Sequence, residues 1–298
     1  MDSPQTHTPP HNEKTIMGHP RGLVILFLTE MWERFSYYGM RGLLVVYLTQ
    51  HFLFSDERSS LLYGAYTALV YVMTIIGGSL ADRYLGARKA VTFGAILLTL
   101  GHFGMTFEGS GSKQLLEYND TQYQISLDAR GGDAKQLIIS DSGTSYVTFT
   151  ETDMLITEPE AVDLPAVIPR DQFTMSVETE EEYLMMLYLS LALLIAGVGF
   201  LKANISTIVG SLYGFGDSRR DSGFTIFYMG INIGAFLASI FCGYLGIVHG
   251  WKYGFGLAGI GMLIGLVVFL SCQSWLEGKA EPPSVEKLKE KVFLFINV

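Results

Sequence analysis

Six long apolar stretches constrain this 298-residue chain more than any other feature of its sequence. Each is close to the ~20 residues that a helix needs to cross a bilayer. The stretches cover residues 22–49, 59–80, 88–107, 183–213, 222–246 and 252–273. Apolar residues make up 49 % of the chain and charged residues only 16 %, with a mean hydropathy of +0.31. This composition is typical of membrane proteins, and the sequence predicts an all-α membrane protein with six transmembrane helices.

One polar segment interrupts the apolar pattern, between the third and fourth stretches. Residues 108–182 carry 16 acidic and 4 basic side chains, a net charge of −12, while the whole chain has −9. Two parts of the segment, TQYQISLDARGG and SYVTFTETDMLIT, alternate in polarity and are rich in residues that favour strands. We therefore expect a small β-rich insert. It contains no histidine and no metal-ligand cluster, so it is expected to adjust stability, partners or access rather than to catalyse a reaction.

The two ends and the loops set the expected orientation. Residues 1–21 are polar and are predicted to be a disordered tail. Residues 274–298 resemble an unfinished linker, in which Ser284 could cap an amphipathic helix. Eleven Lys and Arg residues lie on the side that holds both ends, against six on the other side. The positive-inside rule then places both ends in the cytoplasm and the insert outside an inner or plasma membrane.

The first apolar stretch carries charges that a lipid-facing helix would exclude. Its polar and aromatic side chains are Glu30, Glu33, Arg34, Tyr37, Tyr38 and Arg41. At ~100° per residue they share an arc of roughly 140°. A charge that faces lipid costs at least ~2.5–3.5 kcal/mol, so we expect this face to line a water-filled cavity.

Polar groups from four helices are expected at one depth. The depth of a residue follows from its distance along the helix from the nearest charged loop, at ~1.5 Å per residue. By this count, the hydrocarbon core of the bilayer, ~30 Å thick, holds Arg34, Tyr71, Lys202 and Asn232 at depths of about 17–22 Å. All four are therefore near the middle of the membrane. This arrangement is typical of a transporter with a midplane substrate site.

Lys202 has no oppositely charged neighbour in its own helix, and the Glu30 and Glu33 pair is the candidate partner. A buried carboxylate held by a cation can act as a proton switch, because protonation weakens the pair. The alternative is that these charges only form an ion-pair cluster that holds helices together.

Other reactive side chains point to packing rather than to chemistry. His102, Cys242 and Cys272 all lie in apolar stretches and are interpreted as buried packing residues. There is no Gly-Lys-Ser/Thr loop and no His/Cys cluster. The sequence therefore indicates no metal, no nucleotide, no nucleic-acid partner and no enzymatic activity.

The motif GGSLADRYLGARK, residues 77–89, joins the second and third stretches. It resembles the loop signature of the major facilitator superfamily. The resemblance implies a cytoplasmic gating loop, with roles for Gly78, Asp82, Arg83, Gly86 and Arg88.

Three further motifs narrow the resemblance. EMWERFSYYG (30–39), GVGFLKANIS (197–206) and FYMGINIGA (227–235) are similar to the first-, fourth- and fifth-helix signatures of the proton-dependent oligopeptide transporters. The implied fold is the N-terminal six-helix half of the major facilitator fold, which has about twelve helices. The insert is not part of the common core, and Ala203 stands where the family usually has proline.

The family resemblance also implies roles for single residues. Proton coupling would fall to Glu30, Glu33, Arg34 and Lys202. The substrate would contact Arg34, Tyr37, Tyr38, Arg41, Tyr71, Lys202 and Asn232. The expected function is proton-driven symport of di- and tripeptides, with a missing six-helix half as partner and no cofactor besides the proton gradient. Two alternatives are transport of nitrate or another anion, and a six-helix scaffold or receptor whose β-rich insert binds a ligand.

Overall fold

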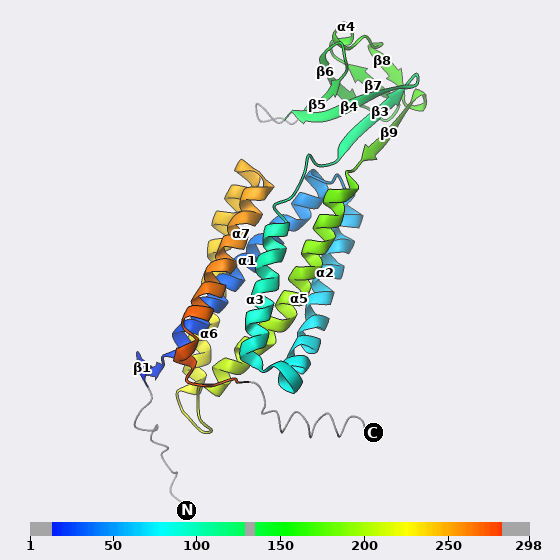
Figure 1. The fold of residues 1–298 in the computed structure, drawn as a ribbon. Helices are drawn as coiled ribbons and strands as arrows, with labels where there is room; N and C mark the ends of the chain where they lie inside the picture. The colour runs from blue at the N-terminus through cyan, green and yellow to red at the C-terminus, as the bar shows by residue number, and fades with distance from the viewer. Residues whose placement is uncertain (1–13, 129–134, 282–298) are drawn as a thin grey trace, which may run out of the picture. The chain divides into compact units, whose positions relative to one another are not determined.

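The structure is a computed structural model that describes residues 14–128 and 135–281. The chain divides into two compact units. Among the described residues, a helical bundle contains residues 14–45, 57–108 and 185–281. A second unit contains residues 46–56, 109–128 and 135–184. Figure 1 shows the long helices of the bundle and the strands of the second unit.

Long helices form wherever the sequence has a long apolar stretch. They are α1 (Gly22–Gln50), α2 (Asp56–Leu80), α3 (Ala87–Gly104), α5 (Glu181–Ser211), α6 (Arg220–Tyr244) and α7 (Trp251–Ser271). The π-helical turns η1 (Ala81–Leu85) and η3 (Leu245–His249) extend α2 and α6. Among the described residues, four helices are long and apolar enough to cross a membrane: α2 with η1, α5, α6 with η3, and α7.

Glycine allows the bundle helices to approach closely. A methyl group on Gly94 of α3 would lie 2.6 Å from the carbonyl oxygen of Gly197 in α5. One on Gly199 of α5 would lie 2.6 Å from the carbonyl oxygen of Met73 in α2. Both distances are too short for a real contact, so only glycine fits. Small residues at crossings are how membrane helices gain packing energy without a hydrophobic drive between them.

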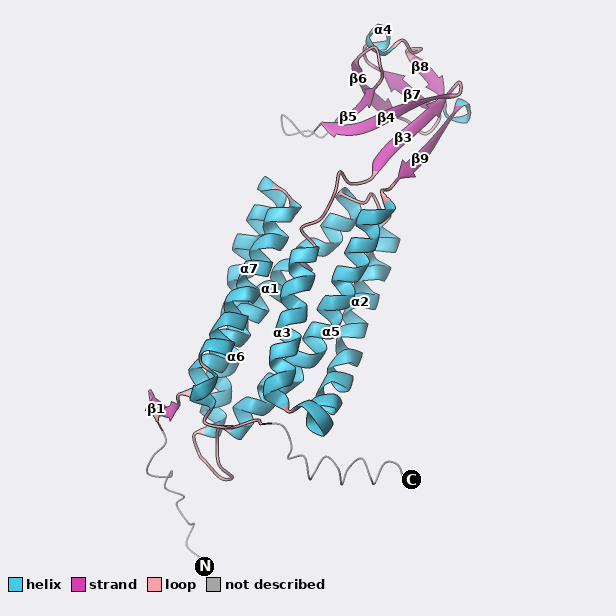
Figure 2. Ribbon diagram, viewed as in Figure 1, coloured by secondary structure: helices cyan, strands magenta, loops and turns pink. Residues whose placement is uncertain are grey.

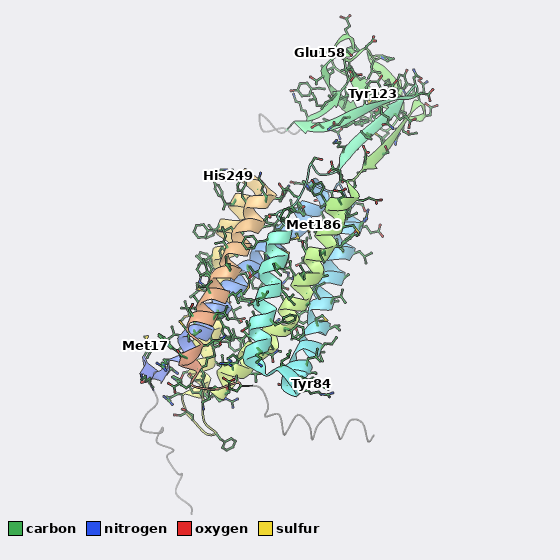
Figure 3. The ribbon with its side chains drawn as sticks, viewed as in Figure 1. Met17, Tyr84, Tyr123, Glu158, Met186 and His249 are labelled. Carbon is green, nitrogen blue, oxygen red and sulfur yellow. The ribbon has the colours of Figure 1, made fainter. Side chains whose placement is uncertain are left out.

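The structure describes residues 14–21, where the sequence analysis predicted a disordered tail, and they contain two short strands. Strands β1 (Thr15–Ile16) and β2 (His19–Pro20) form a hairpin. Its turn residues Met17 and Gly18 have φ of 52° and 82°, as a tight hairpin requires. Figure 3 places Met17 at the same end of the bundle as Tyr84, with His249 at the opposite end.

Contacts that are distant in sequence hold this hairpin in place. His19 Nδ1 lies 2.8 Å from the hydroxyl of Tyr213, and Arg219 Nη1 donates to the carbonyl of Gly18 at 2.9 Å. Residues 1–13, and the helix expected after Ser284, lie outside the described residues.

The second unit contains one antiparallel sheet (Figure 2). Its strands are β3 (Lys113–Tyr118), β4 (Thr121–Asp128), β5 (Lys135–Ile139), β6 (Thr144–Phe149), β7 (Asp153–Ile156), β8 (Val167–Pro169) and β9 (Phe173–Glu178), with helix α4 (Pro159–Val162) between β7 and β8. The strand order is β8-β7-β6-β5-β4-β3-β9. Alternating side chains fill a core of its own that includes Leu116, Ile138, Met154 and Ile168, all fully buried.

Candidate functional site

The charges of α1 form a compact ion-pair cluster. Arg34 Nε lies 3.1 Å from Glu30 Oε1, and it also hydrogen-bonds to Glu33 Oε2. The spacing of four residues brings Glu30 and Arg34 together on one helical face. The side chains of all three residues are at most 4 % exposed.

The burial corrects one sequence-based expectation. The face of α1 was expected to line a water-filled cavity, but its three charged groups at positions 30, 33 and 34 are enclosed by protein. The charged side of α1 faces α2 and α5. Arg41 donates to Tyr63 of α2, and Lys202 of α5 interacts electrostatically with both carboxylates of the cluster. Mutual pairing of the charges then makes their burial tolerable.

The ion pairs leave part of the cluster unsatisfied. Glu30 Oε2, Glu33 Oε1 and Arg34 Nη2 are buried, and the described part of the chain offers none of them a hydrogen bond. Buried polar atoms normally have a partner. These three atoms therefore keep hydrogen-bonding capacity that the described residues do not use.

Lys202 of α5 lies near this cluster but forms no direct ion pair with its carboxylates among the described residues. Its ammonium is 5.2 Å from the ring centroid of Tyr71 in α2. In the described residues no ion pair within 4.0 Å links it to Glu30 or Glu33, although it interacts electrostatically with both carboxylates. Lys202 therefore contributes positive charge to the cluster from another helix.

The remaining predicted substrate residues of α1 extend the cluster along the helix. The guanidinium of Arg34 is 5.0 Å from the ring centroid of Tyr37, whose ring meets that of Tyr38 edge-on at 5.3 Å. Arg41 donates to the hydroxyl of Tyr63 in α2. The sequence reasoning did not single out Tyr63.

Asn232 stands apart from the other predicted site residues. It is exposed on α6, and its amide donates to the backbone carbonyl of Tyr228 at 3.1 Å. Tyr71 is also exposed, at 63 %. Both side chains are therefore accessible from outside the bundle, unlike the charge cluster of α1.

The predicted gating loop folds as the π-helical turn η1, and the chain then changes direction at Gly86, which has a positive φ. Gly86 has φ of 76°, and its amide donates to the carbonyl of Ala81 at 2.8 Å.

The side chains of this loop make one long-range contact: Arg88 binds both carboxylate oxygens of Glu281 at 2.9 Å. Asp82 and Arg83 are exposed, and Gly78 faces Ala203 of α5. The sequence reasoning missed Glu281, because the partner lies 193 residues from Arg88.

Sequence reasoning also missed Tyr66. This tyrosine of α2 is 2 % exposed and interacts electrostatically with Tyr37, Glu33, Arg34 and Arg41. A spacing signal was available, since Tyr63 and Tyr66 are three residues apart and share a helical face.

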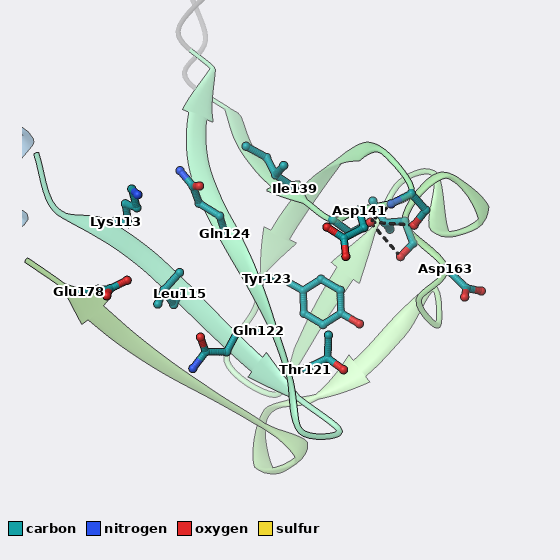
Figure 4. A pocket seen from close by; sticks show the side chains of 13 residues that line it. Lys113, Leu115, Thr121, Gln122, Tyr123, Gln124, Ile139, Asp141, Asp163 and Glu178 are labelled. Atoms are coloured by element: carbon teal, nitrogen blue, oxygen red, sulfur yellow. Dashed lines mark hydrogen bonds between the residues drawn. The ribbon is translucent and has the colours of Figure 1, made fainter. Parts of the chain in front are cut away.

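The β unit has a polar pocket of about 510 Å³ on its sheet (Figure 4). Lys113, Tyr123, Asp141 and Asp163 are among the residues that line it. Its described lining carries lysine, hydroxyl and carboxylate side chains, which can bind polar groups.

A bundle of long apolar helices around buried, paired charges defines an integral membrane protein, in which such charges mark functional sites. The chain belongs to the POT family, whose family model matches residues 88–298. The resemblance that the motifs suggested is confirmed.

Individual relatives agree with this assignment. The chain is 32 % identical to the peptide transporter YePEPT of Yersinia enterocolitica over 270 residues, which are 89 % of this chain and 39 % of the relative. It is 34 % identical to the di-/tripeptide transporter of Lactococcus lactis over 266 residues, 86 % of this chain and 38 % of the relative. The chain thus spans about two fifths of the length of these relatives.

A solved structure shows the same architecture. The crystal structure of a peptide transporter POT in complex with sulfate matches with a TM-score of 0.64 and 32 % sequence identity. The match covers 95 % of this chain and 45 % of that one.

Proposed function

We propose that this chain is the N-terminal half of a proton-coupled symporter of di- and tripeptides. One observation carries the proposal: two buried carboxylates share one arginine and are left with unpartnered oxygens. Intramembrane ionisable groups are costly and are usually retained for function. The similarity to proteins named as peptide transporters supplies the substrate class.

The proposed coupling uses competition for Arg34. While Glu33 is ionised, it holds the guanidinium. A proton that enters from outside neutralises Glu33 and weakens this pair, so Arg34 can turn to the carboxylate of an incoming peptide. One charge moving down 100 mV supplies ~2.3 kcal/mol for uptake. No bound cofactor is needed beyond the proton gradient.

The proposed peptide site uses the groups around the cluster. A peptide carboxylate would bind the cations Arg34, Arg41 and Lys202, because charge-assisted hydrogen bonds are the strongest available. Its backbone or amino end would bind Asn232. Tyr37, Tyr38 and Tyr71 would line the pocket. A second six-helix half would close it and would contact the side chains that are exposed here.

The proposed topology has all six long helices crossing the plasma membrane. Both ends of the segment would lie in the cytoplasm, and the β unit would lie outside. The basic loop residues Arg83, Lys89 and Arg220 favour this orientation. Transport would proceed by rocking of the two halves around the midplane site, with the loop 77–89 as a cytoplasmic gate.

Uptake by the intact transporter that contains this chain tests the proposal. Purified protein in proteoliposomes should accumulate labelled dialanine under an inward proton gradient. Glu33→Gln and Lys202→Ala should each reduce this gradient-driven uptake at least tenfold. The matched controls Asp221→Asn and Lys252→Ala change exposed residues of the same charge and should transport normally.

Two results would contradict the proposal. Gradient-driven uptake that is indifferent to both site variants would remove the coupling assignment. Competition by nitrate, but not by unlabelled dipeptide, would favour the anion transporter instead.

A further inference from the structure

A buried hydroxyl next to the charge cluster has no hydrogen-bond partner. Tyr66 lies in the middle of α2 with 2 % exposure, and the described residues contain no group that hydrogen-bonds to its hydroxyl. Buried tyrosine hydroxyls usually have a partner. The location of Tyr66 therefore calls for an explanation other than apolar packing.

The cluster offers complementary atoms. Glu33 Oε1 is a buried acceptor without a donor, and Arg34 Nη2 is a buried donor without an acceptor. A phenol hydroxyl can donate one hydrogen bond and accept another. These atoms do not bond to one another directly, but the Tyr66 hydroxyl can satisfy both groups through one bridging water molecule.

The register of α1 against α2 places Tyr66 near these atoms. Arg41 and Tyr63 are hydrogen-bonded, which fixes one level at which the helices face each other. The chain reverses direction between them, so residues after Tyr63 in α2 face residues before Arg41 in α1. Tyr66 lies ~4.5 Å further along α2 on the same face. It is therefore displaced toward Arg34 and Glu33.

Electrostatics identifies the groups that act on this hydroxyl. Tyr66 interacts with Tyr37, Glu33, Arg34 and Arg41, all of α1. From α5, Lys202 acts on Glu30 and Glu33. Of these groups, only Glu33 is both an unsatisfied acceptor and an electrostatic neighbour of Tyr66.

We propose that Tyr66 is a positioning residue for proton coupling, whose hydroxyl donates to a water molecule that bridges it to Glu33 Oε1 while Glu33 is ionised. The bridge holds the carboxylate against Arg34 and favours its ionised form. When Glu33 takes a proton from the outside, its hydroxyl becomes a donor and the bridge from Tyr66 is lost or reversed. The protonation state of α1 is thereby communicated to α2. This inference rests on the proposed function of the site.

Tyr66→Phe tests the inference, because it removes the hydroxyl and keeps the ring. The intact transporter is assayed in proteoliposomes for gradient-driven dialanine uptake over a range of external pH. Without the donor, Glu33 is protonated more readily, so half-maximal uptake should move to higher pH by roughly one unit. This is the shift expected from losing one hydrogen bond to a charged group. Peptide exchange at equal pH, which needs no net proton movement, should persist.

Controls separate the inference from folding and from the proposed function. Tyr188→Phe changes an exposed tyrosine of α5 and should keep the wild-type profile. The double variant with Tyr66→Phe and Glu33→Gln should have the same pH of half-maximal uptake as Glu33→Gln alone. If Tyr66→Phe does not fold, 3-fluorotyrosine placed at position 66 strengthens the donor without altering the shape. The profile should then move to lower pH.

The outcomes are distinguishable. Wild-type protein without peptide uptake would overturn the proposed function itself. Wild-type uptake with an unshifted profile in Tyr66→Phe, or in the fluorinated protein, would overturn the role of Tyr66 and leave the proposed function standing.

Discussion

Arg34 is shared between two carboxylates, and this sharing sets the charge balance of the site. Glu30 and Glu33 carry two formal negative charges against one on Arg34, and Lys202 of α5 supplies the second positive charge. The group is neutral only when all four are counted. Adding a proton or a peptide carboxylate changes that balance. The neutrality of this buried cluster therefore depends on residues from two helices.

Part of this cluster could be predicted from the sequence. Charges spaced along α1 fall on one helical face, and this placed Glu30, Glu33 and Arg34 together. The sequence could not show that Lys202 contacts Tyr71 instead of forming a direct ion pair, since that depends on the packing of α5. Tyr66 was missed because the spacing of Tyr63 and Tyr66 does not show which side of α2 packs against the charged face of α1.

At a second residue, Asp217, the structure predicts a pH effect on stability. The side chain and backbone of Arg219 hydrogen-bond to Asp217, and this lowers the pKa of Asp217 below its ordinary 3.8. The stabilisation is fully present above that value and is lost as the pH falls through the lowered pKa. Asp217→Asn should therefore lower Tm by about 1–3 °C at pH 7, and the difference should shrink as the pH falls below 3.8 and through the lowered pKa.

Thermal unfolding in detergent, followed by tryptophan fluorescence at several pH values, measures this difference. Ser218→Ala changes the exposed neighbour and serves as the control. A Tm difference for Asp217→Asn that persists unchanged at pH 3 would show that the charge of Asp217 contributes nothing.

At the scale of elements, apolarity determines where helices form and glycine determines how they pack. The apolar stretches predicted from the sequence start and stop within a few residues of the observed helices. The β1–β2 hairpin could not be predicted, because its six residues are too few to form a recognisable strand pattern. It is held by Tyr213 and Arg219, which are about 200 positions away along the chain. Long-range contacts of this kind leave no local pattern.

The crossing of α2 and α5 gives a direct test of close packing. A methyl group on Gly77 would collide with the carbonyl of Gly199 and lie 2.9 Å from the amide nitrogen of Phe200. Gly77→Ala should therefore destabilise the bundle by about 1–3 kcal/mol, as overpacking does, and lower its Tm by several degrees. Gly64→Ala, in the same helix, meets no atom within 4 Å and should be neutral or slightly stabilising. Equal Tm values for the two variants would contradict this account of the crossing.

At the scale of the whole molecule, acidic and apolar residues are concentrated in different units of the chain. The acidic residues gather in the β unit, while the bundle is apolar and slightly basic, and the sequence composition alone showed this division. The strand order was not predictable. Pairing of β3 with β9, the first and last strands of the sheet in sequence, joins residues about 60 positions apart. No local propensity specifies such a partner.

This pairing predicts that the β unit can be removed from the chain. Lys113 and Glu178 are paired across β3 and β9, and the hydroxyls of Ser112 and Thr179 are 2.7 Å apart. The two connecting strands thus lie side by side, so a short Gly-Ser turn can replace residues 113–178 without moving either end. The buried core of the unit lies wholly between Leu116 and Phe173. We therefore expect two independently folding products.

Both products can be measured. Residues 111–180 expressed alone should be soluble, show β-sheet circular dichroism and unfold cooperatively, whereas the core variant Ile138→Asp should not fold.

The intact protein in which residues 113–178 are replaced should retain a Tm within about 3 °C of the wild type. It should still take up dialanine, because the charge cluster and its supporting helices are unchanged. An unfolded isolated unit would show that the sheet needs the bundle for stability. Loss of uptake at an unchanged Tm would instead assign the β unit a direct part in transport.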